Sequence, residues 1–233
     1  MITQMGPRSK CCERNPALPD RCRYNSRMAR LVELHPADPQ PRRIAEIVAT
    51  IRSGGLLAYP TDSSYALGCH IGDKRAMDRI RRIRKTDKNH NFTLVCSDLS
   101  EISLYARTDN WAYRLIKSLT PGPYTFILQA TREVPKRLQH PRRKTIGIRV
   151  PDNAIVQAIL GALGEPIMSS TLTLPGDDTP LTDVNEIEAR IGHEIDLIVE
   201  GGTTGIEPTS VIDLSEGSIN ILREGRGDTT ALA

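Results

Sequence analysis

Residues 54–68 read GGLLAYPTDSSYALG, and this stretch decides the fold class that the 233-residue chain predicts. A short apolar strand, Leu56 to Tyr59, runs into the turn Pro60-Thr61-Asp62-Ser63-Ser64, which is crowded with hydroxyl groups and contains one carboxylate. A turn at the end of a buried strand can hold a small polar substrate or bridge to a metal. The alternative is an ordinary turn in which Thr61 and Asp62 bond the backbone.

Helical patterns lie on both sides of this strand. Asp38 and Pro39 predict an N-cap and a first-turn proline, and the apolar residues of that helix share one face: Ile44, Ile47, Val48 and Ile51. Asp73 predicts the cap of a second helix, with an apolar face formed by Ala76, Met77, Ile80 and Ile83. The basic residues of this second helix are left toward solvent or a ligand: Lys74, Arg75, Arg79, Arg81 and Arg82.

Further along the chain, helical and extended patterns alternate. Helices are predicted at 98–106, 108–119, 153–163 and 183–191. Strands are predicted at 92–96, 124–128, 145–150, 166–170, 196–199, 210–213 and 218–222. Helices interleaved with short strands indicate a layered α/β fold, and the adjacent strands near the end indicate a mixed sheet.

Composition fits one folded domain. The chain is 39% hydrophobic and 25% charged, which is enough apolar content for one sizeable core. No apolar run approaches the roughly 18 residues of a membrane span, and the first 30 residues lack the apolar stretch of a secretory signal, so we expect a soluble cytoplasmic protein without membrane partners. Residues 1–30 are predicted to be a poorly structured extension, 31–228 the domain and 229–233 a tail. Five cysteines make a disulfide framework an unfavoured prediction.

Charge is distributed unevenly along the chain. Residues 1–176 hold 28 Lys and Arg against 15 Asp and Glu, whereas residues 177–233 hold 3 against 13. Lys74 to Lys88 alone contains eight basic residues and two acidic ones, although such a run is often only a solvated helix face. The basic part is expected to favour phosphates or other anions.

Several familiar signatures are missing. The sequence has no G-x-x-x-x-G-K-[ST] loop, no G-x-S-x-G elbow and no H-E-x-x-H pair. Its one G-x-G, at Gly225 and Gly227, follows the last predicted strand without a helix pattern behind it. Four residues could bind a metal, but their spacing matches no common zinc arrangement, and buried Cys or solvated His explains them better: Cys69, His70, His90 and Cys96.

Hydroxyl and arginine residues at strand ends remain as candidates. Arg149 lies in the otherwise apolar strand TIGIRVP, residues 145–151, where a buried guanidinium would be costly unless it is paired. We therefore expect Arg149 to meet an acid or a bound anion. Hydroxyl residues also follow or open two other strands, although such pairs are often structural: Ser169, Ser170, Thr171, Thr173, Thr209 and Ser210.

Together these stretches resemble the YrdC-like family of threonylcarbamoyl-AMP synthases, and residues 31–228 are similar to its YciO branch. The matching segments are GGLLAYPTDSSYALG at 54–68, TPGPYTFIL at 120–128, TIGIRVP at 145–151, GGTTGIEPTSVID at 201–213 and LREG at 222–225. The resemblance implies an open, twisted mixed sheet of about seven strands, with flanking helices and a basic concave face.

The family's reaction, as the resemblance implies, joins L-threonine, bicarbonate and ATP into threonylcarbamoyl-AMP and pyrophosphate, for a tRNA modification. It needs no covalent nucleophile, and Mg²⁺ is expected with ATP although its ligands are unknown. The residues expected to bind the amino-acid substrate are Ser63, Arg149, Thr171, Thr209 and Ser210. Those expected at the nucleotide are Arg82, Arg84, Asn91, Thr145, Thr173 and Arg223.

The chain departs from the family pattern at two places. Where the family has K-x-R-P, N-P-L and a His, this chain has Arg82-Ile83-Arg84-Lys85, a three-residue insertion, Asn91-Phe92-Thr93 and Cys96. Where the family has S-A-N-x-S-G, this chain has TLTLPG at 171–176. The alternatives are therefore a non-catalytic protein that binds double-stranded RNA or tRNA through the basic surface, and a paralogue that binds a small anionic metabolite without turnover.

Overall fold

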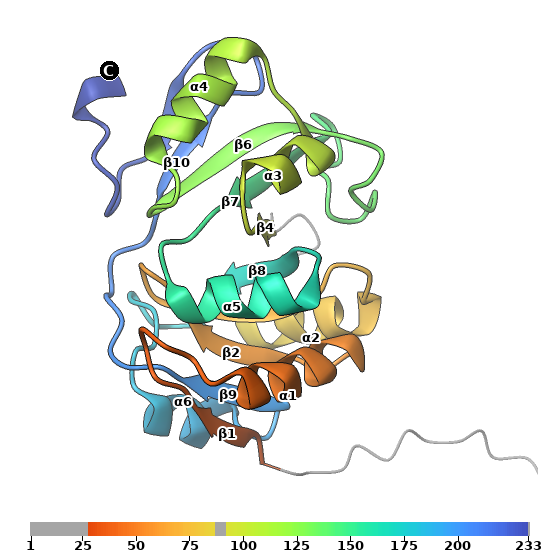
Figure 1. Cartoon of the computed structure of the whole chain (residues 1–233), viewed down its shortest axis with the longest axis vertical. Helices are drawn as coiled ribbons and strands as arrows, with labels where there is room; N and C mark the ends of the chain where they lie inside the picture. The colour runs from red at the N-terminus through yellow and green to blue at the C-terminus, as the bar shows by residue number, and fades with distance from the viewer. Residues whose placement is uncertain (1–27, 87–91, 233) are drawn as a thin grey trace, which may run out of the picture.

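A computed structural model describes residues 28–86 and 92–232, and its helices and strands alternate as the sequence predicts (Figure 1). The helices are α1 Pro41–Arg52, α2 Lys74–Arg84, α3 Leu99–Tyr105, α4 Asn110–Leu119, α5 Ala154–Leu163 and α6 Val184–Ile191, followed by a 3₁₀ turn at Thr230–Leu232. The strands are β1 Arg30–Glu33, β2 Leu57–Pro60, β3 Tyr65–His70, β4 Thr93–Val95, β5 Ala106–Arg107, β6 Tyr124–Ala130, β7 Thr145–Arg149, β8 Ile167–Thr171, β9 Leu197–Glu200, β10 Ser210–Asp213 and β11 Asn220–Arg223.

All these strands belong to one open mixed sheet. Its order is β1-β9-β2-β3-β8-β4-β7-β6-β10-β11, and β5 pairs with β6 beside this path. Parallel pairs such as β4 with β7 and antiparallel pairs such as β3 with β8 occur side by side, so the predicted mixed sheet is confirmed. The predicted strand number of about seven is wrong, because the sheet has eleven strands.

The unpredicted strands have weak sequence signals for physical reasons. β5 has only two residues, and β1 is an edge strand on which one residue of four is buried. β3 reads YALGCH and is buried along almost its whole length, so it shows no alternation of apolar and polar residues. A strand that is covered on both faces loses the period of two by which strands are recognised.

The predicted cap at Asp73 is confirmed, and two other predicted helices also start at a capping side chain. The carboxylates of Asp73 and Asp183 accept hydrogen bonds from the backbone N–H groups of Ala76 and Glu186, and Asn153 caps α5 in the same way. The predicted Asp38 cap is wrong. Helix α1 starts at Pro41, and the backbone N–H of Asp38 instead donates to His35 Nδ1 at 3.0 Å, so residues 35–38 form a turn before the helix.

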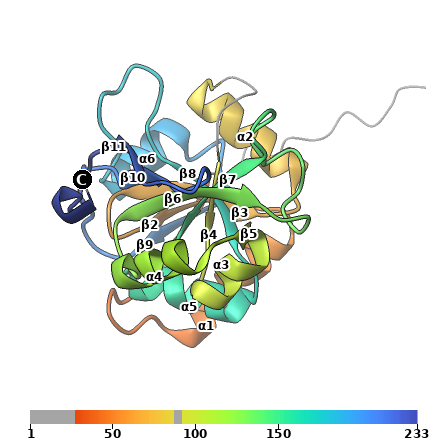
Figure 2. The ribbon, with the colours of Figure 1, turned by 90° about the horizontal axis from the view of Figure 1, so that it is seen from above.

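Helices cover the sheet from both sides. α1 and α5 lie side by side over β2, and their apolar residues form one core cluster with β2, β8 and β9 (Figure 1). Seen from above, α2 and α6 lie on the opposite side of the sheet (Figure 2), and their apolar residues belong to a second cluster that includes α3 and α4. Among the described residues, none of the helices is both long and apolar enough to cross a bilayer.

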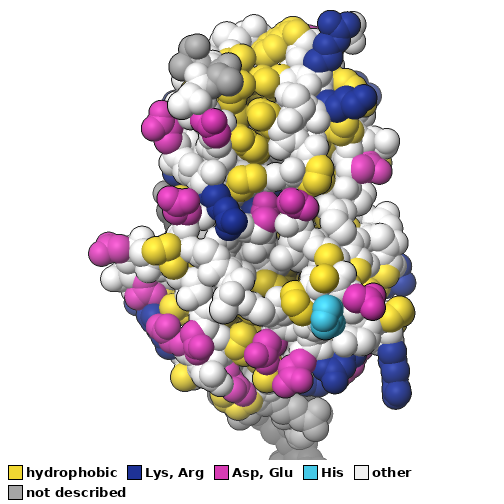
Figure 3. All heavy atoms as spheres, turned by 60° about the vertical axis from the view of Figure 1, so that its left-hand side comes forward, with side chains coloured by type: hydrophobic (Ala, Val, Ile, Leu, Met, Phe, Trp, Pro, Cys, Tyr) yellow, Lys and Arg dark blue, Asp and Glu magenta, His cyan; other side chains and the backbone are white. Residues whose placement is uncertain are grey.

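The basic part of the sequence, residues 1–176, and the acidic part, residues 177–233, both contribute arginines to the main cavity described below. Figure 3 brings forward the side of the molecule on which α6 and the C-terminal segment lie, and acidic side chains are scattered over its lower half. This agrees with the acidic composition of residues 177–233. The arginines that line the main cavity come from both parts of the chain: Arg84, Arg143, Arg149 and Arg223.

Candidate functional site

A cavity of about 790 Å³ lies against the middle of the sheet. Because side chains alternate along a strand, residues two apart share a face, and such residues from four strands line this cavity. They are Thr93 and Val95 on β4, Thr125 and Ile127 on β6, Thr145, Gly147 and Arg149 on β7, and Ser169 and Thr171 on β8. The volume is in the range of small-molecule sites in proteins.

Arg149 is the most deeply placed charge of this cavity. Its guanidinium forms an ion pair with Asp62, and the two side chains are only 10% and 9% exposed. Nη2 also donates to Ser63 Oγ at 3.0 Å. Burial lowers the pKa of Arg149, and the neighbouring Asp62 carboxylate acts in the opposite direction. The expectation that Arg149 meets an acid is thus confirmed, and the acid belongs to the protein itself.

Two atoms of this ion pair have no hydrogen-bond partner. Within the described part of the chain, Arg149 Nε and Asp62 Oδ2 are both buried and unpartnered. Leaving a buried polar group without a partner costs about 1–3 kcal/mol, more for a charged group. A donor and an acceptor that stay unsatisfied in one pair therefore point to a ligand that satisfies both.

The turn that carries Asp62 is held by its own threonine. Thr61 Oγ1 donates to the carbonyl of Ser64 at 2.6 Å and accepts from the backbone N–H groups of Ser63 and Ser64, both at 3.2 Å. For Thr61, the ordinary-turn interpretation is correct. For Asp62 it is not, because one carboxylate oxygen faces Arg149 and the other has no partner among the described residues.

A second wall of the cavity carries Arg84. Its Nη1 donates to Ser170 Oγ and its Nε to the carbonyl of Thr173 at 3.3 Å, so α2 is linked to the segment after β8. Burial lowers the pKa of Arg84. At the neighbouring position of β8, Ser169 Oγ accepts a hydrogen bond from the hydroxyl of Tyr59 at 2.7 Å, and burial raises the pKa of Tyr59 to about 12.

A third wall carries Arg223 from β11. Its guanidinium donates from Nη2 at 2.8 Å and from Nε at 3.0 Å to the carbonyl of Thr209, whose hydroxyl lies 2.9 Å from that of Thr125. Burial lowers the pKa of Arg223, and the nearby positive charge of Arg149 lowers it further. Two guanidiniums that repel each other across a cavity favour an anion between them.

Most of the predicted site residues lie at this cavity. The predicted residues that line it are Arg84, Thr145, Arg149, Thr171, Thr173, Thr209 and Arg223. Ser63 is not part of the lining, and its hydroxyl accepts a hydrogen bond from Arg149. Ser210 does not line the cavity, because its hydroxyl is fully buried between Gly225 N and Gly227 O. Arg82 lies elsewhere, opposite Glu194 at 3.5 Å. Asn91 lies outside the described residues.

The cavity also contains residues that the sequence does not single out. Arg143 and His140 come from the loop before β7, and Asp178 and Glu207 from two other loops. Their positions depend on how distant loops fold over the sheet, which periodicity does not reveal. Of the residues that the predicted site leaves out, Asp62 has the strongest sequence signal, because it is the one carboxylate in a turn of hydroxyl-bearing residues.

The described cysteine and histidine residues do not gather as a metal centre. In residues 28–86 and 92–232, no three His, Cys, Asp or Glu side chains are grouped so as to hold a metal ion. Cys69 and Cys96 are buried free thiols with raised pKa values caused mainly by burial, and His70 Nε2 lies 3.0 Å from Glu165 Oε1. His90 lies outside the described residues. Cys96 does not line the cavity.

The arginines of α2 are largely engaged in ion pairs. Arg79 contacts Asp196 at 2.7 Å and Arg81 contacts Asp78 at 3.3 Å. A second, more open groove of about 840 Å³ is lined mostly by basic residues and lies at the end of this helix: Lys74, Asp78, Arg81, Arg82, Lys85, Thr86 and Arg137.

The chain is similar to known proteins over most of its length. A family model named for Sua5, YciO and YrdC and described as "Telomere recombination" matches residues 49–225. An uncharacterized protein of Haemophilus influenzae is 58% identical over 203 residues, which cover 87% of this chain and 98% of that protein. The crystal structure of E. coli YciO matches with a TM-score of 0.85 and 52% identity, covering 88% of this chain and all of that chain.

Two more distant matches have informative descriptions. A threonylcarbamoyl-AMP synthase of Vibrio cholerae is 28% identical over 186 residues, which cover 78% of this chain and 97% of that protein. The crystal structure of P. abyssi Sua5 complexed with L-threonine matches with a TM-score of 0.77 and 24% identity, covering 84% of this chain and 57% of that chain. At this identity the second match shows a shared fold.

Proposed function

Because the chain belongs to the Sua5/YciO/YrdC family, we propose that it binds L-threonine and ATP in the main cavity and performs threonylcarbamoyl-AMP chemistry there. In that reaction the amine of threonine and bicarbonate form a carbamate and water. A carbamate oxygen then bonds to the α-phosphorus of ATP, while the bond to the β-phosphate oxygen breaks and pyrophosphate leaves. The reverse reaction uses the same groups.

The unsatisfied Asp62–Arg149 pair is the observation that carries this proposal. Arg149 Nε is a buried donor and Asp62 Oδ2 a buried acceptor, and the described residues supply no partner for either. An α-amino acid presents the complement, since its carboxylate accepts hydrogen bonds and its amine donates them. Its binding would remove two desolvation penalties at once, and charge-assisted bonds of this kind are the strong ones.

The nucleotide phosphates are assigned to the walls formed by Arg84 and Arg223. Both guanidiniums are partly buried, and burial lowers their pKa values, so a phosphate group would stabilise their charged forms. The neighbouring hydroxyls of Thr145 and Thr173 line the same space. Mg²⁺ commonly binds through one or two carboxylates and the substrate's phosphates, and Asp178 and Glu207 are the carboxylates that line the cavity.

The protein's own contribution would be alignment and charge neutralisation. A reaction in which one bound substrate attacks another needs the reacting atoms held at short distance, and this can lower the barrier without an enzyme nucleophile. Donors fixed around the developing charge stabilise the transition state further. The hydroxyls on β4, β6, β7 and β8 and the arginines on α2, β7 and β11 would take both roles.

The departures from the family pattern predict weaker catalysis. Thr173 lines the cavity where the family motif has an asparagine. A hydroxyl cannot replace both the donor and the acceptor of a carboxamide, and one lost buried partner costs about 1–3 kcal/mol. By contrast, the replacement at Cys96 lies outside the cavity lining, so we assign it no direct loss of a contact.

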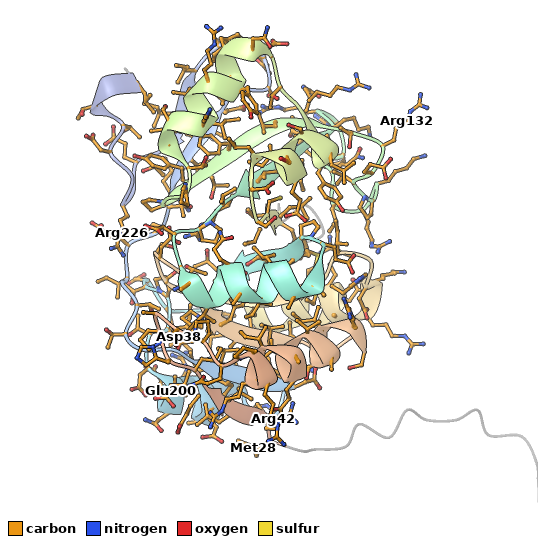
Figure 4. All side chains as sticks on the ribbon, in the orientation of Figure 1. Met28, Asp38, Arg42, Arg132, Glu200 and Arg226 are labelled. Carbon is orange, nitrogen blue, oxygen red and sulfur yellow. The ribbon has the colours of Figure 1, made fainter. Side chains whose placement is uncertain are left out.

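Pyrophosphate release tests the proposal. The full chain, incubated with ATP, Mg²⁺, bicarbonate and L-threonine, is expected to release pyrophosphate and to form threonylcarbamoyl-AMP in a threonine-dependent manner. Arg132→Ala, at an exposed loop position that is not part of the cavity lining, is expected to behave like the parent protein (Figure 4). Binding of both ligands without release of pyrophosphate would contradict the catalytic part of the proposal and leave a protein that only binds the substrates. Neither binding nor turnover would contradict it.

A second candidate function is binding of double-stranded RNA or tRNA, and the basic groove at α2 favours it. Five of the residues that line this groove are Lys or Arg, against the single acid Asp78. Such binding would depend on phosphate contacts and would weaken steeply with salt. A duplex RNA whose affinity does not change between low and high salt would exclude this mode.

A further inference from the structure

The Gly225-Arg226-Gly227 sequence forms a strap beside the candidate site. We use "strap" for residues 224–228, which follow β11 and include the one G-x-G of the chain. The strap is attached to β10 and β6: Ser210 Oγ accepts from Gly225 N at 3.0 Å and donates to Gly227 O at 2.6 Å, and Tyr124 donates to the carbonyl of Asp228 at 3.1 Å.

The two glycines are needed for this close packing. A Cβ atom at Gly225 would lie 2.3 Å from the carbonyl oxygen of Pro208, and one at Gly227 would lie 2.4 Å from the ring of Tyr124. Distances this short to backbone or to a packed ring exclude a side chain at either position. The G-x-G therefore allows the strap to approach the fold closely, and it fixes the position of the Arg226 backbone.

Arg226 reaches from the strap to the turn that carries Asp62. Its Nη1 donates to the backbone carbonyl of Asp62, while its own N–H donates to the carbonyl of Pro208 at 2.9 Å. Figure 4 shows Arg226 at the left edge of the molecule, level with the gap between the ribbons of the lower and upper halves. Arg226 is thus a side chain that fastens the C-terminal segment, on the β10 side, to the turn between β2 and β3.

Arg226 also acts on the ion pair through its charge. Its positive charge is one of the influences that lower the pKa of Arg149, after the larger effect of burial. Arg226 does not line the cavity, and its contact is with the backbone of the Asp62 turn rather than with the two unpartnered atoms of the ion pair. We infer that Arg226 is a positioning residue of the candidate site, which holds the Asp62–Ser63 turn against Arg149 and adds positive potential for an anionic ligand.

This inference rests on the proposed function for its ligand, but its structural half can be measured without one. Backbone amide exchange of Ser63 and Ser64, measured by NMR in the ligand-free protein, reports on the turn because both amides donate to Thr61 Oγ1. We expect Arg226→Ala to raise their exchange rates about tenfold, Arg226→Lys to restore most of the protection, and Arg132→Ala to change nothing. Unchanged rates in Arg226→Ala would overturn the inference.

Ligand binding tests the functional half by calorimetry. We expect Arg226→Ala to weaken L-threonine binding about tenfold and ATP binding less than twofold. The reason is that Arg226 contacts the turn of Asp62, whereas Arg84 and Arg223 are held by the carbonyls of Thr173 and Thr209. Arg226→Gln, which keeps a donor without the charge, should lie between Ala and Lys. An equal loss for both ligands would identify a general structural role and contradict the inference. Failure of the parent protein to bind threonine would contradict the proposed function instead, and amide exchange would still decide the role of Arg226.

Discussion

The arginines of two arginine–aspartate pairs line the same cavity, behind which Asp62 and Asp213 contact them, and the two pairs differ in how completely their hydrogen bonds are satisfied. Asp213 is buried, yet each of its oxygens has a partner: Oδ2 faces Arg143, and Oδ1 accepts from the N–H and hydroxyl of Ser215 at 3.0 and 2.7 Å. Asp62, by contrast, keeps Oδ2 unpartnered, and its partner Arg149 keeps Nε unpartnered. The first pair is closed, whereas the second leaves one donor and one acceptor for a third group.

Exposure separates the pairs in the same way. The Arg143 side chain is 40% exposed, so water can accept hydrogen bonds from the donors that do not contact Asp213. Arg149 is 10% exposed and has no such option for Nε. The comparison teaches that the number of arginines in a cavity does not identify a binding site. What singles out Arg149 is the combination of burial, a place in the cavity lining, and a donor and an acceptor that stay unsatisfied within one ion pair.

Arg149→Ala is expected to have the largest effect. Removing the guanidinium leaves Asp62 buried without its counter-charge, which typically costs about 3–5 kcal/mol of unfolding free energy, and it also removes the proposed carboxylate contact. We expect L-threonine binding to fall at least 100-fold and the urea midpoint to drop. The sequence alone leaves an acid and a bound anion open as the partner of Arg149, and the pair with Asp62 is the reason that we expect a loss of stability.

Arg149→Lys separates stability from recognition in the same experiment. A lysine keeps the positive charge near Asp62 but lacks the planar fork that binds a carboxylate through two bonds. We expect a smaller loss of stability than in Arg149→Ala, with binding still reduced more than tenfold. Full binding by Arg149→Lys would mean that the pair recognises charge alone, and the comparison of open and closed pairs would lose its basis.

Asp62→Asn asks whether the open pair recognises an amine. The variant keeps the shape of the side chain but removes the carboxylate that would accept from an ammonium or amine group. We expect L-threonine to bind about tenfold more weakly, while 3-hydroxybutyrate, which lacks the amine, binds no worse than to the parent protein. Calorimetric titration with both compounds gives the answer. Equal losses for the two compounds would show that Asp62 acts only by holding Arg149.

Thr173→Asn acts on the wall that departs from the family motif. An asparagine at this cavity position can donate and accept, so we expect ATP binding or turnover to rise about three- to tenfold, which corresponds to about 0.7–1.4 kcal/mol. The ATP affinity and the rate of pyrophosphate release are the measurements. No gain, in a variant that folds like the parent protein, would show that this wall no longer binds a nucleotide.

Asp213→Asn should have the smallest effect and should depend on pH. Burial alone would raise the pKa of Asp213, but hydrogen bonds from Arg143 and Ser215 outweigh it, and the pKa lies below its usual value. A carboxyl group with a lowered pKa in the folded state stabilises the fold above its unfolded pKa, about 3.9, and this stabilisation is lost as the pH falls through the folded value.

We therefore expect Asp213→Asn to cost less than about 1 kcal/mol at pH 7, since Arg143 is well exposed. The difference from the parent protein should shrink as the pH falls below about 4 and vanish only below the lowered pKa of Asp213 in the folded state. Urea unfolding as a function of pH measures this. Threonine binding should change less than twofold. A large loss of binding in this variant would show that the closed pair also belongs to the ligand site.

Much of the fold is readable from the sequence because local signals agree with the packing. The carboxylate cap at Asp73, together with apolar residues spaced three and four apart, predicts α2 correctly. The signals fail where local chemistry is ambiguous. Asp38 resembles a cap but lies in a turn with His35, and β3 is too uniformly buried to show alternation.

The site is readable in part, since TIGIRVP places a charge in an apolar strand and so predicts a partner for Arg149. The acid that pairs with Arg149 is determined by the tertiary structure, because Asp62 lies 87 residues away in sequence. The same limit applies to Arg82 and Arg84, which sit two positions apart on α2. Only Arg84 turns toward the cavity, and helical geometry alone does not tell which of the two faces the site.

The central claim is that the Asp62–Arg149 pair binds an amino acid inside the arginine-lined cavity. A crystal structure of the full chain with L-threonine and a non-hydrolysable ATP analogue tests it most directly. The account predicts the threonine carboxylate at Arg149, its amine at Asp62 Oδ2, and the triphosphate between Arg84 and Arg223. Threonine bound elsewhere, or a cavity in which Asp62 and Arg149 keep the same two atoms unpartnered at saturating ligand, would contradict it.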